Sequence, residues 1–274
     1  MKKALEFIKM SASGNDFILI KNLDKTFDTK KLKDLAKKMC HRNKGIGADG
    51  LLVWEKYKGF DGFMRIFNPD GTEPKMCGNG ARCFAFWLTD QLKKERLVIK
   101  TQSSPIFAQK VSEDLIRIKM PDPQDIRLNL KFKIKSKVFN ADFINTGVPH
   151  TVIFTQNLQN LNILDIAPVI RYNKMFGNEG TNVDFAQVLG KNKILVRTYE
   201  RGVENETYSC GTGNVAVSLL YVLKFIKKDS AHQIKVVNKY KDSQTVYFKN
   251  KGRNFFDIWL EGKVNLICEG KFYL

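Results

Sequence analysis

The pattern of apolar and polar positions along the chain predicts one amphipathic helix and a long series of strands. Leu32, Leu35, Ala36 and Met39 follow helical spacing, so residues 29–41 are predicted to form a helix whose lysines face outward. Short apolar or alternating segments separated by turn residues predict strands. These strands cover residues 5–10, 17–20, 51–55, 63–67, 139–144, 151–154, 182–188, 194–199, 234–237, 245–249, 255–260 and 263–268.

Two other segments, residues 81–88 and 215–226, are apolar on every side. This pattern is typical of helices that are buried all round. Residues 13–16 read Ser-Gly-Asn-Asp, which predicts a turn after the first strand. In residues 131–138 every second residue is a lysine, which predicts one strand with a lysine face at the edge of a sheet.

The best candidate for a linker is the segment 120–125, because Pro121 and Pro123 lie two residues apart and prevent regular structure. We therefore expect an N-terminal domain of residues 1–120, completed by the last strand at about residues 263–274. Residues 121–262 would form the C-terminal domain. This division agrees with the soft prior of about 150 residues per domain.

The second half of the chain repeats the order of features in the first half. Arg65 precedes Cys77 by almost the same interval that separates Arg197 from Cys210. Such a duplication predicts an α+β fold of two pseudo-symmetric domains. In each, a curved, mostly antiparallel or mixed sheet would wrap around a central buried helix. The starts of the two buried helices would then face each other across an interdomain cleft that holds the active site.

Each buried helix is preceded by the same short motif. Cys77-Gly78-Asn79-Gly80 precedes the first helix, and Cys210-Gly211-Thr212-Gly213 precedes the second. Glycines before a helix allow successive backbone N–H groups to point at one ligand. The helix N-terminus adds partial positive charge, which suits a carboxylate and is expected to lower the pKa of a nearby thiol. Each motif therefore predicts a reactive cysteine beside an anion-binding site.

The overall charge is strongly positive, at +18 from 46 basic and 28 acidic residues. Nucleic-acid binding is one interpretation, and a steep loss of binding with rising salt would reveal it. We favour solvated surface lysines, because the lysines are dispersed along the chain. Five cysteines without a secretion signal predict free thiols in a reducing cytoplasm, and no apolar run is long enough to span a membrane. The scattered histidines and the lack of a Cys-x-x-Cys motif argue against a zinc site, and we expect no metal and no cofactor.

Several motifs taken together resemble diaminopimelate epimerase over essentially the whole chain, in that family's order. They are Ser13-Gly14-Asn15-Asp16-Phe17, Gly45-Ile46-Gly47-Ala48-Asp49-Gly50, Phe67-Asn68-Pro69-Asp70-Gly71, Met76 to Cys83, Gly147-Val148-Pro149-His150, Tyr199-Glu200-Arg201-Gly202 and Ser209 to Gly213. The combination is specific, whereas any one motif alone would be weak. Two positions depart from forms of the family. Val148 stands where several members have a substrate-binding Asn, and Gly50 stands where some have Gln.

The resemblance implies a pyridoxal-independent epimerase that converts L,L-2,6-diaminopimelate to the meso form, in the pathway to lysine and cell-wall precursors. It implies an acid/base pair formed by Cys77 and Cys210. It also implies a homodimer that binds a small-molecule substrate and neither nucleic acid nor membrane. The remaining site residues that it implies are of two kinds: substrate-binding Asn15, Asn68, Gly78, Asn79, Asn182, Glu200, Arg201, Gly211 and Thr212, and pKa-tuning His150 and Glu200.

Inversion of an amino-acid α-carbon requires a base on one face and an acid on the other, and two thiols can supply both. The nearest rival is another two-thiol racemase of the same general fold, acting on proline or hydroxyproline. Glu200-Arg201 and the three asparagines favour a substrate with a second amino-acid end.

From the residues alone, other interpretations stay open. Cys77 and Cys210 could be buried structural thiols, His150 and Arg201 surface residues, and Asn15 a plain turn residue. The remaining cysteines are interpreted as structural: Cys40, Cys83 and Cys268.

Overall fold

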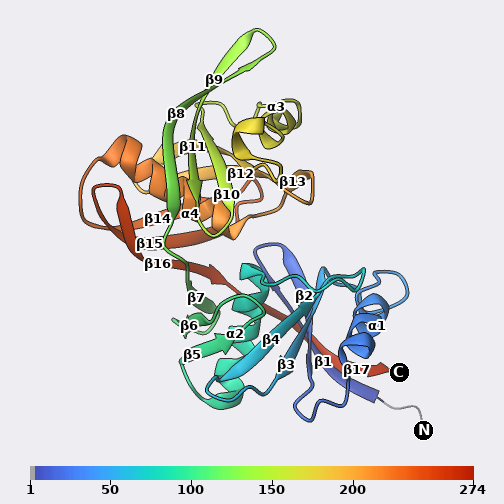
Figure 1. Cartoon of the computed structure of the whole chain (residues 1–274). Helices are drawn as coiled ribbons and strands as arrows, with labels where there is room; N and C mark the ends of the chain where they lie inside the picture. The colour runs from blue at the N-terminus through green and yellow to red at the C-terminus, as the bar shows by residue number, and fades with distance from the viewer. Residues whose placement is uncertain (1–3) are drawn as a thin grey trace. The chain divides into compact units, whose positions relative to one another are not determined.

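The computed structural model describes residues 4–274 and divides into two compact units. Unit 1 runs up to Lys119 and includes Gly262–Leu274, and unit 2 comprises Met120–Glu261. Each unit is a mixed sheet with two helices in its chain connections (Figure 1). No helix within residues 4–274 is long and apolar enough to cross a membrane.

The sheet of unit 1 has the strand order β17-β1-β2-β3-β4-β5-β6-β7. The pairs β2–β3 and β4–β5 are parallel and the other pairs are antiparallel. Each parallel pair is joined by a crossover that contains a helix, first α1 (Thr29–Met39) and then α2 (Gly78–Leu92). The strands are β1 (Ala4–Ala12), β2 (Asn15–Lys21), β3 (Gly50–Glu55), β4 (Gly62–Phe67), β5 (Arg96–Lys100), β6 (Ile106–Lys110), β7 (Leu115–Lys119) and β17 (Asn265–Tyr273).

Unit 2 repeats this plan in the order β8-β9-β10-β11-β12-β14-β15. The parallel pairs are β10–β11, with α3 (Ile163–Arg171) in the crossover, and β12–β14, with α4 (Gly211–Tyr221). A π-helical turn, Val222–Ile226, continues α4, and a short 3₁₀ turn, Lys174–Phe176, follows α3. The strands are β8 (Gln124–Ile134), β9 (Lys137–Asn145), β10 (Pro149–Phe154), β11 (Asn182–Gly190), β12 (Lys193–Glu200), β13 (Asn205–Thr207), β14 (Ala231–Val237), β15 (Ser243–Lys251) and β16 (Asn254–Lys263).

The same alternation of antiparallel and parallel pairs in both units confirms the predicted α+β fold with duplicated units. Apolar side chains cover both faces of the central strands. In unit 1, Ile18 and Leu51 pack with Leu32 of α1, whereas Leu52 lies against the start of α2. Burial on both faces explains why these strands read as continuous apolar runs instead of alternating ones. The helices α2 and α4 each contact several strands of their own unit, as predicted for buried helices.

Three local predictions were wrong or incomplete. The segment 131–138 is a hairpin and not a single strand, because β8 ends at Ile134 and β9 begins at Lys137. Lys135 adopts a φ of 54° in the turn, a conformation that glycine or asparagine usually marks, so the sequence carried no signal for it. The predicted turn at residues 13–16 is shorter, because β2 already begins at Asn15. We did not predict β5, β6, β7, β13 or α3, and Pro168 inside α3 interrupts the helical pattern there.

Candidate active site

The start of α4 in unit 2 holds Cys210 over a buried pair of ionisable side chains. Cys210 is the N-cap residue of α4 and is 8% exposed. Three residues after Cys210, Gly213 packs directly on the pair formed by His150 and Asp184. A side chain at position 213 would overlap Asp184 and lie 3.3 Å from Cε1 of His150. The second glycine of the motif therefore allows the helix to begin directly on these two groups.

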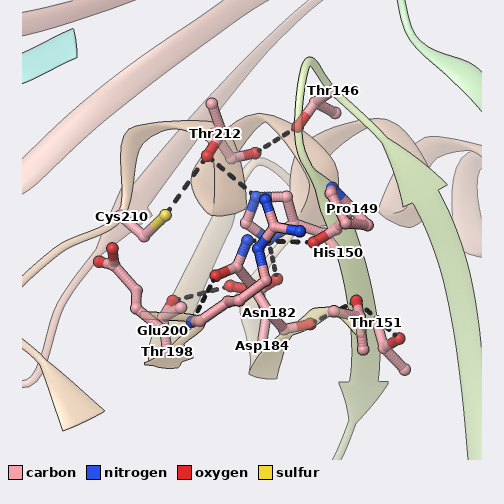
Figure 2. A network of polar contacts seen from close by, with 12 residues as sticks. Thr146, Pro149, His150, Thr151, Asn182, Asp184, Thr198, Glu200, Cys210 and Thr212 are labelled. Atoms are coloured by element: carbon pink, nitrogen blue, oxygen red, sulfur yellow. Dashed lines mark hydrogen bonds and ion pairs between the residues drawn. The ribbon is translucent and has the colours of Figure 1, made fainter. Parts of the chain in front are cut away.

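A continuous polar network leads from Cys210 into the interior (Figure 2). The sulfur of Cys210 lies 3.4 Å from the hydroxyl of Thr212, which lies 2.9 Å from Nε2 of His150. Nδ1 of His150 lies 2.7 Å from Oδ2 of Asp184, and the hydroxyl of Thr198 donates to Oδ1 at 2.7 Å. Because the carboxylate can only accept, His150 carries its proton on Nδ1 when neutral, and Nε2 then accepts from Thr212. Thr212 therefore couples the thiol to the buried pair.

Three neighbouring strands supply this network. His150 lies on β10, Asp184 on β11 and Thr198 on β12, where Thr198 is the register partner of Asp184. His150 and Asp184 are both fully buried. A buried carboxylate without hydrogen-bond partners would lower the free energy of unfolding, and the contacts to His150 and Thr198 offset this penalty for Asp184.

Glu200, at the end of β12, lies beside Cys210. Thr207 donates to Glu200 Oε1 at 2.5 Å, and burial raises the pKa of the Glu200 carboxyl. Burial, followed by the negative charges of Glu200 and Asp184, raises the pKa of the Cys210 thiol well above its usual range. We had expected the helix N-terminus to lower this pKa. The helix dipole acts against desolvation and two nearby carboxylates, and these outweigh it. Cys210 is therefore held as a protonated thiol, the form that can donate a proton.

Asn182 and Arg201 lie next to this network. The side chain of Asn182 donates to the carbonyl of Pro149 at 3.0 Å and accepts from the backbone N–H of Arg201 at 2.8 Å. Asn182 thus fixes the turn that carries Arg201. The Arg201 guanidinium forms an ion pair of 2.8 Å with Glu179, whose side chain is 85% exposed. An exposed pair of this kind is weak, so Arg201 can exchange Glu179 for another anion.

Unit 1 places Cys77 at the matching position. Cys77 is the N-cap residue of α2, is half-buried, and accepts a hydrogen bond from the backbone N–H of Gly80 at 3.5 Å. Gly78 is the first residue of α2 and Asn79 is the second. The side chain of Asn79 donates to Oδ1 of Asn15 at 2.5 Å. The structure therefore brings Cys77, Asn79 and Asn15 together at one helix start.

Asn68 has a local structural role in this structure. Its side-chain amide donates to the hydroxyl of Thr72 at 2.9 Å, and its backbone N–H donates to the Thr72 carbonyl at 2.8 Å. Gly50 begins β3, and an added side chain there would lie 3.2 Å from the carbonyl oxygen of Phe67 and 3.3 Å from the ring of Phe17. A glutamine at position 50 would therefore require its neighbours to move, which explains glycine in this chain.

An arginine–glutamate pair precedes each cysteine. Arg65 on β4 contacts Glu73 through Nε and Nη2, both at 2.8 Å. Arg197 on β12 contacts Glu206 through Nε at 2.9 Å and Nη2 at 2.8 Å. Glu73 and Glu206 lie in the segments that lead to Cys77 and Cys210, so these two-pronged contacts hold both segments to the sheet. The duplicated sequence pattern contains the two arginines but gives no sign of their glutamate partners.

The sequence analysis missed Asp184, Thr198, Thr146 and Arg82. Thr146 donates to the backbone carbonyl of Thr212 at 3.0 Å and so holds the residue that links Cys210 to His150. Asp184 and Arg82 did carry a signal in the sequence. Each is a charged residue inside a segment that is otherwise apolar, and both are fully buried.

Comparison with known proteins gives a consistent family assignment. The model of the family described as Diaminopimelate epimerase matches residues 7–124 and 143–250. The diaminopimelate epimerase of Methanocella arvoryzae is 36% identical over 283 residues, covering 97% of this chain and 96% of the relative. That of Chlorobaculum tepidum is 34% identical over 268 residues, covering 97% of this chain and 100% of the relative.

Solved structures share the fold at low sequence identity. A phenazine biosynthesis protein of the PhzF family from Bacillus anthracis superposes with a TM-score of 0.79 at 15% identity, covering 99% of this chain and 100% of that one. A hydroxyproline epimerase from Agrobacterium vitis gives a TM-score of 0.68 at 14% identity, covering 100% of this chain and 94% of that one. With the family match and the relatives taken together, the chain belongs to the diaminopimelate epimerase family.

Proposed function

We propose that this chain interconverts L,L-2,6-diaminopimelate and meso-diaminopimelate by moving one α-proton between Cys77 and Cys210, without pyridoxal phosphate. The observation that carries the proposal is the duplicated arrangement of the two thiols. Cys77 and Cys210 each cap a buried helix and are each followed by Gly-x-Gly. Two thiols in matching surroundings suit a reaction that removes a proton from one face of a carbon and returns it to the other.

The two thiols would start in different protonation states. Burial and the charges of Glu200 and Asp184 favour the neutral thiol of Cys210. Cys77 is half-buried and accepts a hydrogen bond from a helix N–H group, an environment that favours the thiolate. In the starting state Cys77 would therefore be the base that removes the proton, and Cys210 the acid that supplies one. After one turnover the roles are exchanged.

Each helix start would bind polar groups of the substrate. The N–H groups of Gly78, Asn79, Gly211 and Thr212 would bind a substrate carboxylate, since these residues begin α2 and α4 and the N-terminus of a helix favours negative charge. They would also stabilise the charge that develops on the substrate carboxylate as the proton leaves. Arg201, with Glu200, would contact the polar groups of the substrate, because its ion pair to exposed Glu179 can be exchanged for a carboxylate.

A direct assay tests the activity. Purified protein is incubated with L,L-2,6-diaminopimelate in heavy water, and both isomers are analysed by mass spectrometry at low conversion. We expect early product to contain solvent deuterium at the inverted carbon while unreacted substrate keeps its protium. Product that retains mostly substrate hydrogen would exclude two separate bases.

Single substitutions assign the reaction to the two thiols. Cys77→Ala and Cys210→Ala should each abolish epimerisation and leave the circular dichroism spectrum unchanged. Cys268→Ala is the matched control, because Cys268 is an exposed free cysteine on β17. Near-normal turnover of either active-site variant would refute the two-thiol mechanism.

The similarity to a hydroxyproline epimerase concerns the fold alone, at 14% identity, and leaves the substrate open. A second substrate test is therefore needed. L-Proline and hydroxyproline should be poor substrates if Glu200 and Arg201 recognise a second amino-acid end. Faster turnover of either compound than of diaminopimelate would favour the alternative function. We further propose that the enzyme acts as a cytoplasmic homodimer in the biosynthesis of lysine and peptidoglycan precursors.

A further inference from the structure

Arg82 is a fully buried arginine with an unusual set of partners. It lies in the first turns of α2 and is 0% exposed. No ion pair joins it to an acidic residue within residues 4–274. Within the same residues, Nε and Nη1 have no hydrogen-bond partner, while Nη2 donates to the hydroxyl of Ser13 at 3.0 Å and to Oδ1 of Asn79 at 2.6 Å.

The guanidinium fixes the orientation of two asparagine amides. Because arginine can only donate, the atom of Asn79 that faces it must be the oxygen. The Nδ2 group of Asn79 then points the other way and donates to Oδ1 of Asn15 at 2.5 Å. Asn15 in turn donates from Nδ2 to Oδ2 of Asp49 at 3.2 Å. In this series of hydrogen bonds each group donates to the next, from Arg82 through Asn79 and Asn15 to the carboxylate of Asp49.

This direction determines which atoms the site offers to a ligand. Each of the two amides uses one N–H and one lone pair of its oxygen in these hydrogen bonds, so the second N–H of Asn79 and of Asn15 remains as a donor for a ligand. A group bound there must accept hydrogen bonds, as a carboxylate does. Reversal of the two amides would present oxygens instead and would repel an anion.

In the second unit, different residues orient the position two residues after the cysteine. Thr212 stands two residues after Cys210, as Asn79 stands two residues after Cys77, and Thr212 is oriented by Nε2 of His150 at 2.9 Å. The residue that matches Arg82 in α4 is Val215, which is apolar and fully buried. In each unit, a buried ionisable side chain thus orients the residue two positions after the cysteine.

We propose that Arg82 is a positioning residue of the epimerase site, which holds Asn79 and Asn15 as donors and supplies a buried positive charge to Cys77. The inference rests on the proposed function for its effect on turnover. Burial lowers the pKa of Arg82 to about 10, and the negative charges of the Cys83 and Cys77 thiolates act in the opposite direction. Burial also raises the pKa of Cys83, which therefore stays neutral. The cation thus acts on Cys77, which caps the same helix five residues before Arg82.

A purely structural role is a poor explanation for this arginine. A buried cation without an anionic partner is unfavourable, and apolar side chains of similar volume often stabilise a protein when they replace buried charges. Arg82→Met should therefore leave the thermal midpoint unchanged or raise it. The same substitution should lower kcat/KM about ten- to a hundredfold, the usual effect of removing a group that orients a ligand-binding residue.

The decisive measurement is the rate of Cys77 alkylation by iodoacetamide as a function of pH, followed peptide by peptide with mass spectrometry. In Arg82→Met the profile of Cys77 should move to higher pH by about one unit, so that alkylation at a fixed lower pH slows about tenfold. Arg82→Lys, which keeps both the charge and a donor, should restore most of the wild-type profile. The profile of Cys210 should be the same in all variants.

Two controls separate the possible outcomes. Cys83→Ala disturbs the packing of the same helix without a change of charge, so it should lower the thermal midpoint and leave the Cys77 profile unchanged. If Arg82→Met does not fold, Arg82→Gln decides the question, because it keeps a donor for Asn79 and loses the charge. An unchanged Cys77 profile in the folded neutral variant would overturn the proposal. Inactivity of the wild-type protein toward diaminopimelate would instead count against the proposed function, since the alkylation profile needs no turnover.

Discussion

Replacement of Thr212 by valine is expected to disconnect Cys210 from the buried pair of His150 and Asp184. The Thr212 hydroxyl lies 2.9 Å from Nε2 of His150 and 3.4 Å from the sulfur of Cys210, and it is the link between them. Valine has nearly the same shape but no hydroxyl. The contact from Thr146 to the Thr212 backbone carbonyl, at 3.0 Å, does not depend on the side chain and should persist.

The expected loss of stability follows from the burial of His150. Thr212→Val leaves Nε2 of a fully buried histidine without its partner. An unpaired buried polar group lowers the free energy of unfolding by about 1–3 kcal/mol. In a protein of this size each kcal/mol changes the thermal midpoint by about 2–4 °C, so the midpoint should fall by roughly 2–12 °C.

A loss of activity is expected in addition to this loss of stability. A positioned acid or base contributes about a hundredfold or more to the rate, and Cys210 would lose the group that orients its proton. We expect kcat/KM for diaminopimelate to fall about a hundredfold, measured from the isomer ratio over time at a temperature where the variant is folded.

Thr212→Ser is the matched control, because serine keeps the hydroxyl and loses only a methyl group. It should retain most of the activity and a thermal midpoint close to that of the wild type. A valine variant with wild-type kcat/KM would refute the coupling of Cys210 to His150. A serine variant as inactive as the valine variant would show that the methyl group, and not the hydroxyl, is needed.

Three further predictions concern other groups of the two units. Arg197→Lys replaces the two-pronged contact to Glu206 by a single one and should lower the free energy of unfolding by about 1.5–3 kcal/mol, seen as a lower thermal midpoint. Burial raises the pKa of Cys83 in the folded protein. The contribution of this thiol to the free energy of unfolding is therefore complete below about pH 8.5, the pKa of a cysteine in the unfolded chain, and is lost as pH rises above it. In Cys83→Ala the decline of unfolding free energy above that pH should therefore be shallower, by about 1.4 kcal/mol per pH unit. Glu200→Gln removes a negative charge that raises the pKa of Cys210, so alkylation of Cys210 near neutral pH should become faster while kcat/KM falls.

Each of these predictions has its own control. Lys193→Arg, at an exposed position on the same strand as Arg197, should leave the thermal midpoint unchanged. A slope equal to that of the wild type in Cys83→Ala would mean that this thiol ionises equally well in the folded and unfolded protein. Unchanged alkylation of Cys210 in Glu200→Gln would show that burial and Asp184 hold that thiol neutral without Glu200.

Local patterns were sufficient for most of the secondary structure and for the two cysteine motifs. The buried helices α2 and α4 were predicted because a helix that is apolar all round has to be buried wherever it lies. The glycines of both motifs were interpretable because they act on the backbone next to them. Periodicity failed where a local signal was absent, as at Lys135, whose left-handed turn carries no glycine.

The chemistry of the site depends on the tertiary structure. Three strands and a helix supply the network of Thr198, Asp184, His150 and Thr212. No spacing along the chain predicts that the polar atoms of these residues form successive hydrogen bonds. The pKa of Cys210 is the clearest case. The sequence places this thiol at a helix N-terminus, which by itself lowers its pKa. The packing of the unit buries the thiol and brings two carboxylates near it, and these two effects outweigh the helix N-terminus. The sequence does not show them, because desolvation and Coulomb energy depend on distances through space.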